Sequence, residues 1–89
     1  FLLPNVPNPF NPQTQISFNL PFEGRLDVSV YDTLGRIVRS IVSGDSKPGL
    51  QTVVWNGRDD FGREVASGTY FLRLRFDDMV SIRKMLLLR

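Results

Sequence analysis

The chain contains neither cysteine nor histidine, and these two absences remove much of the chemistry that enzymes use. Without cysteine there is no disulfide, no thiolate nucleophile and no thiolate metal ligand. Without histidine the chain lacks the side chain best suited to proton transfer near neutral pH and the commonest nitrogen ligand of metals. A serine nucleophile would need a buried lysine as its base, and Lys47 and Lys84 are the lysines present. The composition therefore predicts a protein that is not an enzyme and needs no cofactor or metal.

Long apolar runs and long basic runs are also missing. The longest apolar stretch is only a few residues, so we expect no membrane span. The 11 basic residues are scattered and the net charge is +2, which predicts no binding of nucleic acid. The start at Phe1 has neither a charged segment nor a long apolar core. We therefore expect any export signal to lie upstream, in a longer parent protein.

What the chain does contain is typical of one small folded domain. Its apolar fraction of 42% and charged fraction of 22% favour a packed fold over disorder. A chain of 89 residues buries enough surface for a single thin core. Residues 1–14 hold most of the prolines, so we predict an extended, proline-rich lead-in there and one folded domain over residues 15–89.

Apolar and polar residues alternate in short segments that recur about every ten residues, and no helical periodicity is seen. Ile16, Phe18 and Leu20, for example, alternate with polar residues, which is the period-two pattern of a half-buried strand. Residues 43–49 are expected to form a loop because of their composition. The predicted strands span residues 15–20, 25–31, 36–42, 50–55, 70–76 and 80–88. This pattern predicts an all-β fold, a small antiparallel immunoglobulin-like β-sandwich of about seven strands with no disulfide.

A turn-rich corner separates the fourth and fifth predicted strands. Trp55, at its start, is expected to pack in the core between the sheets. Asn56 and Gly57 both tolerate positive φ angles, while Asp59 and Asp60 can each cap their own backbone as Asx turns. Every polar residue of the corner therefore has a structural role to fill. The glycines expected to close further bends are Gly62 and Gly68.

The same corner holds the acidic cluster that most resembles a site, made of Asp59, Asp60 and Glu64. Glycosidase carboxylates must face each other across a cleft, whereas two adjacent residues in a tight turn diverge. Calcium could bind Asp59, Asp60 and backbone carbonyls, but the spacing matches no standard binding loop. Turn capping is therefore the favoured interpretation, and calcium binding stays open as an alternative.

The last predicted strand, over residues 80–88, combines apolar and basic residues. Its apolar residues of one parity are expected to pack inward beside Tyr70, with Arg83 and Arg89 facing out. Lys84 interrupts that inward parity, which indicates either an edge position or a shift of register near Met85. The residues expected to point inward are Val80, Ile82, Leu86 and Leu88.

An ordered set of motifs resembles one family. Residues 5–12 are similar to the family's opening Asn-Tyr-Pro-Asn-Pro-Phe-Asn-Pro, with Val6 in place of the tyrosine. A Tyr-Asp-x-x-Gly-Arg turn follows, matched by Tyr31, Asp32, Gly35 and Arg36, and then come a Trp-Asn-Gly-Arg-Asp corner, an Ala-Ser-Gly-Thr-Tyr-Phe step and a basic-apolar ending. The set resembles the C-terminal sorting domain of type IX secretion, also called the Por secretion system. The related immunoglobulin-like domain of flagellar hook-capping proteins shares the turn and the tryptophan corner.

The resemblance implies a non-catalytic domain at the C-terminus of a larger secreted protein, often a hydrolase, of a Bacteroidetes-like bacterium. The outer-membrane type IX export machinery would recognise the folded domain and send the covalently linked cargo to the cell surface or the medium. We expect the domain to be a monomer. The candidate recognition residues are Arg83, Lys84 and Arg89.

Two other functions remain open. An accessory carbohydrate-binding module would need an exposed aromatic platform, whereas a spacer or a hook-capping-type structural domain would need no site at all. The aromatic residues that could form such a platform are Phe10, Phe22, Tyr31, Phe61 and Phe71.

Overall fold

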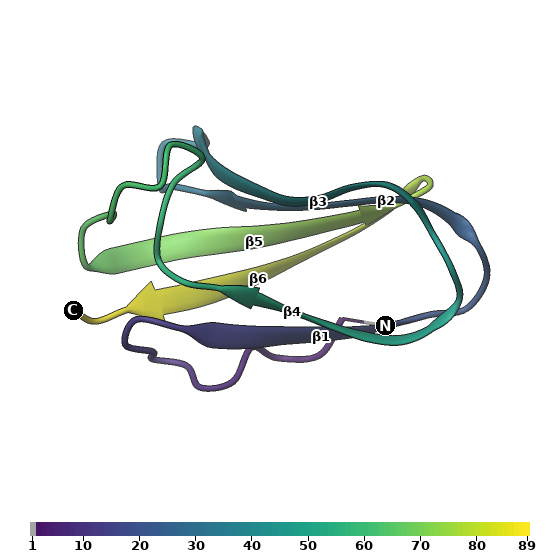
Figure 1. Ribbon diagram of the computed structural model, residues 1–89, viewed down its shortest axis with the longest axis horizontal. Helices are drawn as coiled ribbons and strands as arrows, with labels where there is room; N and C mark the ends of the chain where they lie inside the picture. The colour runs from purple at the N-terminus through teal and green to yellow at the C-terminus, as the bar shows by residue number, and fades with distance from the viewer. Residues whose placement is uncertain (1) are drawn as a thin grey trace.

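The computed structural model describes residues 2–89 as a β-sandwich of six antiparallel strands (Figure 1). The two antiparallel sheets confirm the predicted fold class. The strands are β1 (Thr14–Leu20), β2 (Gly24–Tyr31), β3 (Ile37–Ser46), β4 (Gly49–Trp55), β5 (Gly68–Phe76) and β6 (Met79–Leu87).

One sheet contains β1 and β4, and the other has the order β3-β2-β5-β6. Within a regular strand the inner face carries the apolar residues of one parity, because successive side chains of a strand point to opposite faces. In β3, where the pairing with β2 shifts register twice, both Ile41 and Val42 pack against the core. The alternation predicted for β1, β2 and β5 is confirmed, and their apolar rows meet in one core. The buried members of these rows are Ile16, Phe18, Leu20, Leu26, Val28, Val30, Tyr70, Leu72, Leu74 and Phe76.

The proline-rich lead-in packs along the sandwich. Leu2 and Phe10 are buried in the same core cluster as the strand residues. Leu2 forms a bridge with Phe18 of β1, and Phe10 forms a parallel bridge with Leu87 of β6. The lead-in thus joins the two sheets along one side of the sandwich, where it lies beside β1 in Figure 1.

The prediction of a loop over residues 43–49 is wrong except at residues 47 and 48. β3 continues to Ser46 and β4 begins at Gly49, so only Lys47 and Pro48 lie between the two strands. Pairing with β2 holds the polar end of β3 in the sheet, with Gly44 opposite Leu26 and Asp45 opposite Arg25. Tertiary pairing therefore outweighs the loop-like composition of this segment.

The predicted orientation of the last strand is also wrong. Met85 and Leu87 are the buried residues of β6, whereas Val80, Ile82 and Leu88 are each about half exposed. Leu86, on the parity of Val80 and Ile82, is partly exposed. The register with β5 decides this, because Met85 lies opposite the buried Tyr70 and shares its face.

Lys84 consequently does not interrupt an inward row. It lies opposite Phe71 on the outer face of the sheet, and the pairing of β5 with β6 runs without a shift from Gly68 to Phe76. Of the two explanations predicted for Lys84, the edge position holds, since β6 is the last strand of its sheet.

Candidate functional site

Trp55 and Tyr70 form the buried base of the corner. The indole of Trp55 is 1% exposed, and its ring centroid lies 5.6 Å from that of Phe10 and 5.2 Å from that of Tyr70. The indole Nε1 donates to the carbonyl of Arg58 at 2.9 Å, and the Tyr70 hydroxyl donates to the carbonyl of Ala66 at 2.6 Å. Burial raises the pKa of Tyr70 above its usual value. Tyr70 thus resembles the tyrosine corner of immunoglobulin-like domains, in which a hydroxyl near the start of a strand holds the preceding chain.

Asp59 and Asp32 occupy equivalent places in two turns of the same sequence pattern, Asp-x-x-Gly-Arg. In the second turn Asp59 Oδ1 accepts from the amides of Phe61 at 2.9 Å and Arg63 at 3.0 Å. Its Oδ2 pairs with the Arg63 guanidinium at 3.2 Å. Gly62 donates back to the Asp59 carbonyl with a φ of +79°, where a residue with a Cβ would be strained.

The first turn repeats these contacts. Asp32 Oδ1 accepts from the amides of Leu34 and Arg36 at 2.9 Å, Oδ2 pairs with the Arg36 guanidinium at 2.9 Å, and Gly35 has a φ of +78°. The amide of Arg36 is the main cause that lowers the pKa of Asp32, and the amide of Arg63 does the same for Asp59. The repeated Asp-x-x-Gly-Arg pattern is visible in the sequence, but strand periodicity does not connect its two copies.

Asp60 acts differently from the prediction. Asp60 does not cap its own turn: its Oδ1 accepts from the amide of Ser40 at 2.9 Å, and its amide donates to the carbonyl of Val38. The carboxylate therefore ties the corner to β3. Asn56 does not adopt a positive φ, and its side chain accepts from the Arg58 amide at 3.2 Å instead. Gly57 alone of the Asn-Gly pair takes the left-handed conformation, with a φ of +73°.

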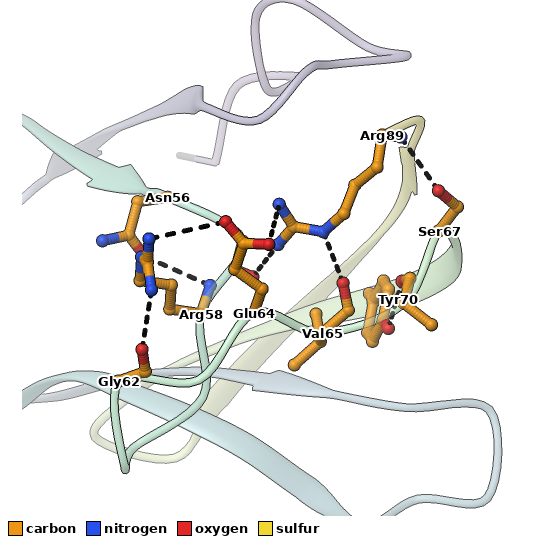
Figure 2. A network of polar contacts seen from close by, with 10 residues as sticks. Asn56, Arg58, Gly62, Glu64, Val65, Ser67, Tyr70 and Arg89 are labelled. Carbon is orange, nitrogen blue, oxygen red and sulfur yellow. Dashed lines mark hydrogen bonds and ion pairs between the residues drawn. The ribbon is translucent and has the colours of Figure 1, made fainter.

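Arg89 links the end of the chain to this corner (Figure 2). Its guanidinium donates to the carbonyls of Val65 and Gly57, and its backbone amide donates to Ser67 Oγ at 2.9 Å. Its Nη1 lies 3.8 Å from Glu64 Oε2. The contacts reach from Gly57 to Ser67, so the predicted outward orientation of Arg89 is wrong: its side chain is only 24% exposed.

Glu64 and Arg58 extend the same network. Glu64 Oε1 lies 3.5 Å from the Arg58 guanidinium, which also donates to the carbonyl of Gly62 at 2.8 Å. A Cβ at Gly57 would lie 2.8 Å from Arg89 Nη2 and 3.1 Å from the carbonyl of Pro12, so the Arg89 side chain would have to shift, and the φ of +73° also disfavours a side chain there. Gly68, the first residue of β5, follows with a φ of +149°. The sequence carries no local sign of this network, because its members are spread over residues 56–89.

Arg83 and Lys84 lie on opposite faces of β6. Their contacts differ from those of Arg89, so the structure does not bring the three residues together in one site. The guanidinium of Arg83 donates to the carbonyl of Leu2 at 3.0 Å and so contacts the lead-in. The side chain of Lys84 is exposed, while its carbonyl accepts from Asn8 Nδ2 at 3.3 Å. Of the three candidate recognition residues, Lys84 is the one whose charged group is left on an open face.

The outer face of the larger sheet has a shallow hollow near Lys84. Its lining includes Tyr31, Phe71 and Ile82, and the guanidinium of Arg73 lies 4.9 Å from the centroid of the Tyr31 ring. The other aromatic candidates are dispersed. The rings of Phe22 and Phe76 are tilted by 41° with their centroids 5.0 Å apart, Phe10 is buried, and Phe61 is 82% exposed with Arg63 over its ring.

The described residues offer little that could hold a metal. No group of three or more acidic, histidine or cysteine side chains in residues 2–89 is arranged as ligands. In the acidic cluster, the Asp59 carboxylate is taken by backbone amides and Arg63, and Glu64 faces two arginines. This same part of the chain contains no helix that could cross a membrane.

Several solved structures share the fold. PorU from Porphyromonas gingivalis superposes with a TM-score of 0.78 at 20% identity over 98% of this chain and 9% of PorU. PorZ from the same organism superposes with a TM-score of 0.65 at 22% identity over 100% of this chain and 11% of PorZ. FlgD from Pseudomonas aeruginosa gives a TM-score of 0.64 at 28% identity over 83% of this chain and 60% of FlgD.

The chain thus spans about a tenth of PorU and PorZ and three fifths of FlgD. At their identity levels, PorU and PorZ show likeness of fold alone. Comparison with curated protein sequences finds no significant match. The model of the FlgD Ig-like domain matches residues 8–77, a range that includes both Asp-x-x-Gly-Arg turns and the Trp55 corner. The chain therefore belongs to the family of FlgD Ig-like domains.

Proposed function

We propose that this domain is a non-catalytic sorting domain that directs a longer protein through the type IX secretion system to the cell surface or the medium. The observation that carries the proposal is the way the chain's basic-apolar ending is built into the fold. Met85 and Leu87 enter the core, Arg89 holds the tryptophan corner, and the charge of Lys84 stays outside. An export machine that binds the folded domain would contact this ending as part of the folded surface.

The likeness to known proteins adds support of a more general kind. PorZ is described as an essential surface component of the type IX secretion system, and a part of PorZ that amounts to 11% of its length has the fold of this whole chain. The sequence adds the asparagine-proline opening, whose Asn8 bonds to β6: Asn8 Oδ1 accepts from the Leu86 amide at 2.9 Å. The opening and the ending, which the resemblance attributes to sorting domains, are therefore held together as one surface.

The test is a fusion of the 89-residue chain to the C-terminus of a periplasmic reporter, expressed in a host with a type IX system. We expect the fusion to reach the surface, and a matched host without the system to retain it in the periplasm. Lys84→Glu should reduce surface display several-fold, because the reversed charge lies on the exposed face of β6. Lys47→Glu, the same charge reversal at an exposed lysine between β3 and β4, is the control and should leave display unchanged, although it also breaks an exposed ion pair with Glu23 at 3.1 Å.

Folding must be separated from recognition in this test. Surface substitutions generally change stability by no more than about 0.5 kcal/mol, so both variants should keep the wild-type melting temperature within a few degrees. Equal display of the fusion in hosts with and without the type IX system would exclude the sorting function. Equal loss of display in the two lysine variants would exclude Lys84 as a recognition residue.

A structural role of the hook-capping kind is the second candidate. It is favoured by the family match over residues 8–77 and by the 28% identity to FlgD of Pseudomonas aeruginosa. A chimaeric FlgD carrying this chain in place of its own Ig-like domain distinguishes the two functions. Restored flagellar assembly, together with failed display in the secretion host, would favour the structural role.

A further inference from the structure

The four edge strands of the two sheets differ in how far other parts of the chain cover their outer backbone groups. An edge strand exposes unpaired N–H and C=O groups, which can pair with another extended segment. The edge of β1 is covered by the lead-in, since the amides of Leu3 and Val6 donate to the carbonyls of Ser17 and Gln15 at 2.9 Å. The edge of β6 is covered near its end, where Phe10 exchanges hydrogen bonds with Leu86 and Leu88.

The edge of β3 is partly covered and otherwise irregular. Asp60 bonds to Val38 and Ser40 there, so the corner lies against the first half of the strand. The pairing of β3 with β2 has two register shifts, and Asp45 places a charge in the second half. Covering loops, irregular pairing and charges are the means by which proteins prevent strand addition at an edge.

Among the described residues, 2–89, none protects the outer edge of β4 in these ways. The N–H and C=O groups of successive residues in a strand point to opposite sides. In β1, Gln15 and Ser17 bond to the lead-in, so the backbone groups of the residues between and beside them point toward β4. These residues are Thr14, Ile16, Phe18 and Leu20. In the observed register, Ile16 lies opposite Val53 and Phe18 opposite Gln51. The backbone groups of the intervening residues therefore point away from β1. These residues are Leu50, Thr52 and Val54.

Nothing within residues 2–89 pairs with this edge, because β1 is the only strand bonded to β4 in the described sheets. Residues 48–56 carry no charged side chain, in contrast to the rest of a chain with 22% charged residues. Leu50 and Val54 are 69% and 48% exposed. The strand thus offers three N–H and three C=O groups on an uncharged, β-branched segment, which is the composition that favours strand pairing.

The two strands on this side of the sandwich carry partly buried apolar side chains. The lead-in joins β1 to β6 on one side of the sandwich, which leaves β3 and β4 as the facing strands of the other side. Lys47 and Pro48 connect these two strands at one end, as the curve between β3 and β4 in Figure 1 shows. The partly buried residues that belong to these strands and pack against the core are Val38, Ile41, Val42 and Val53.

We propose that the free edge of β4 binds an extended segment of another protein chain as an added antiparallel strand. The segment would be uncharged over about five residues, with its N–H and C=O groups bonded to Leu50, Thr52 and Val54 and its inward apolar side chains lying against the β3–β4 side. The inference is independent of the sorting function.

The probe is a fluorescent peptide with the sequence of residues 49–55, Gly-Leu-Gln-Thr-Val-Val-Trp, flanked by lysines for solubility. This sequence is complementary to β4 in antiparallel register, with leucine opposite Val54, threonine opposite Thr52 and valine opposite Leu50. Binding to the 89-residue chain is measured by fluorescence anisotropy. Amide hydrogen exchange should slow at Leu50, Thr52 and Val54 on binding, and change little at Gln51 and Val53, which already face β1.

Methylated peptides test the hydrogen bonds without altering the protein. N-methylation of the leucine, threonine and last valine removes the amides that face β4 and should weaken binding about tenfold or more. N-methylation of the glutamine and first valine, whose amides face away, is the control and should change the affinity much less. Equal weakening by both patterns, or no saturable binding of the unmodified peptide, would overturn the proposal.

Protein variants give an independent comparison. Thr52→Pro removes the central outward N–H, and proline is tolerated where an edge amide faces solvent. Thr52→Val keeps that N–H but loses the same hydroxyl contact with Ser17, at 3.0 Å, and so serves as the control. We expect about tenfold weaker binding for proline and near wild-type binding for valine. Sedimentation measures whether the chain itself dimerises. A wild-type dimer that is absent in Thr52→Pro would show that a second copy occupies the β4 edge, and would refute an extended segment of another protein as the occupant.

Discussion

Removing the indole of Trp55 is the most direct test of how the corner is held. The ring is 1% exposed, contacts Phe10 and Tyr70, and donates to the carbonyl of Arg58. Trp55→Ala loses all three contacts and leaves a cavity, so it should lower the free energy of unfolding by about 4 kcal/mol. A domain of 89 residues has a total stability of about 4 to 13 kcal/mol, so this loss could unfold much of the protein.

Trp55→Phe separates packing from hydrogen bonding. Phenylalanine keeps an aromatic ring between Phe10 and Tyr70 but leaves the Arg58 carbonyl without the indole N–H. We expect a loss of about 1 to 2 kcal/mol for this variant, from the hydrogen bond and the smaller volume.

Because Trp55 is the sole tryptophan, unfolding should be followed by circular dichroism rather than by intrinsic fluorescence. Each 1 kcal/mol should shift the melting temperature by about 4 to 8 °C in a domain of this size. A loss below about 1 kcal/mol for Trp55→Ala would contradict the buried position. Equal losses in the alanine and phenylalanine variants would show that the hydrogen bond, and not packing, is the main contribution.

Two further predictions concern the end of the chain and the acid dependence of stability. Arg89→Ala should lower the free energy of unfolding by about 2 kcal/mol, since a mostly covered guanidinium loses its bonds to Gly57 and Val65. Arg75→Ala, at an exposed arginine on β5, should change it by less than about 0.5 kcal/mol in the same urea titration, and equal losses would contradict the role of Arg89. The folded-state pKa values of Asp32 and Asp59 are lowered from 3.8, so both carboxylates stabilise the fold above about that pH and lose this effect as the pH falls through their folded values. Melting temperatures measured from pH 6 to about pH 2 should fall more steeply for the wild type than for the double variant that carries both Asp32→Asn and Asp59→Asn. Parallel curves would refute the stabilising role of the two carboxylates.

The sequence by itself determined the sandwich and most of its core. In β1, β2 and β5 apolar residues recur at every second position, and Tyr31 and Phe71 are the additional ones on the other face, so the sequence favours burial of one face of each strand. The turn residues Gly35 and Gly62 were equally predictable, because a glycine takes a positive φ without a steric cost.

The inner face of β6 was decided by tertiary structure. Residues 85–88 are all apolar, so alternation cannot assign their faces, and the register with β5 buries Met85 and Leu87. The polar end of β3 is likewise a strand because β2 offers it a partner. In both cases the deciding energy comes from contacts between segments far apart in the chain, which local composition does not record.

The contacts of the candidate site depend on the tertiary structure even more strongly. Arg89 was predicted to face outward, because the end of the chain gives no local sign that Gly57 and Val65 lie beside it. The open edge of β4 is also a property of the whole fold, since it follows from where the lead-in and the corner lie. Sequence fixes which residues can pair or be buried, whereas the packing of distant segments decides which polar groups are satisfied within the domain and which remain free for a partner.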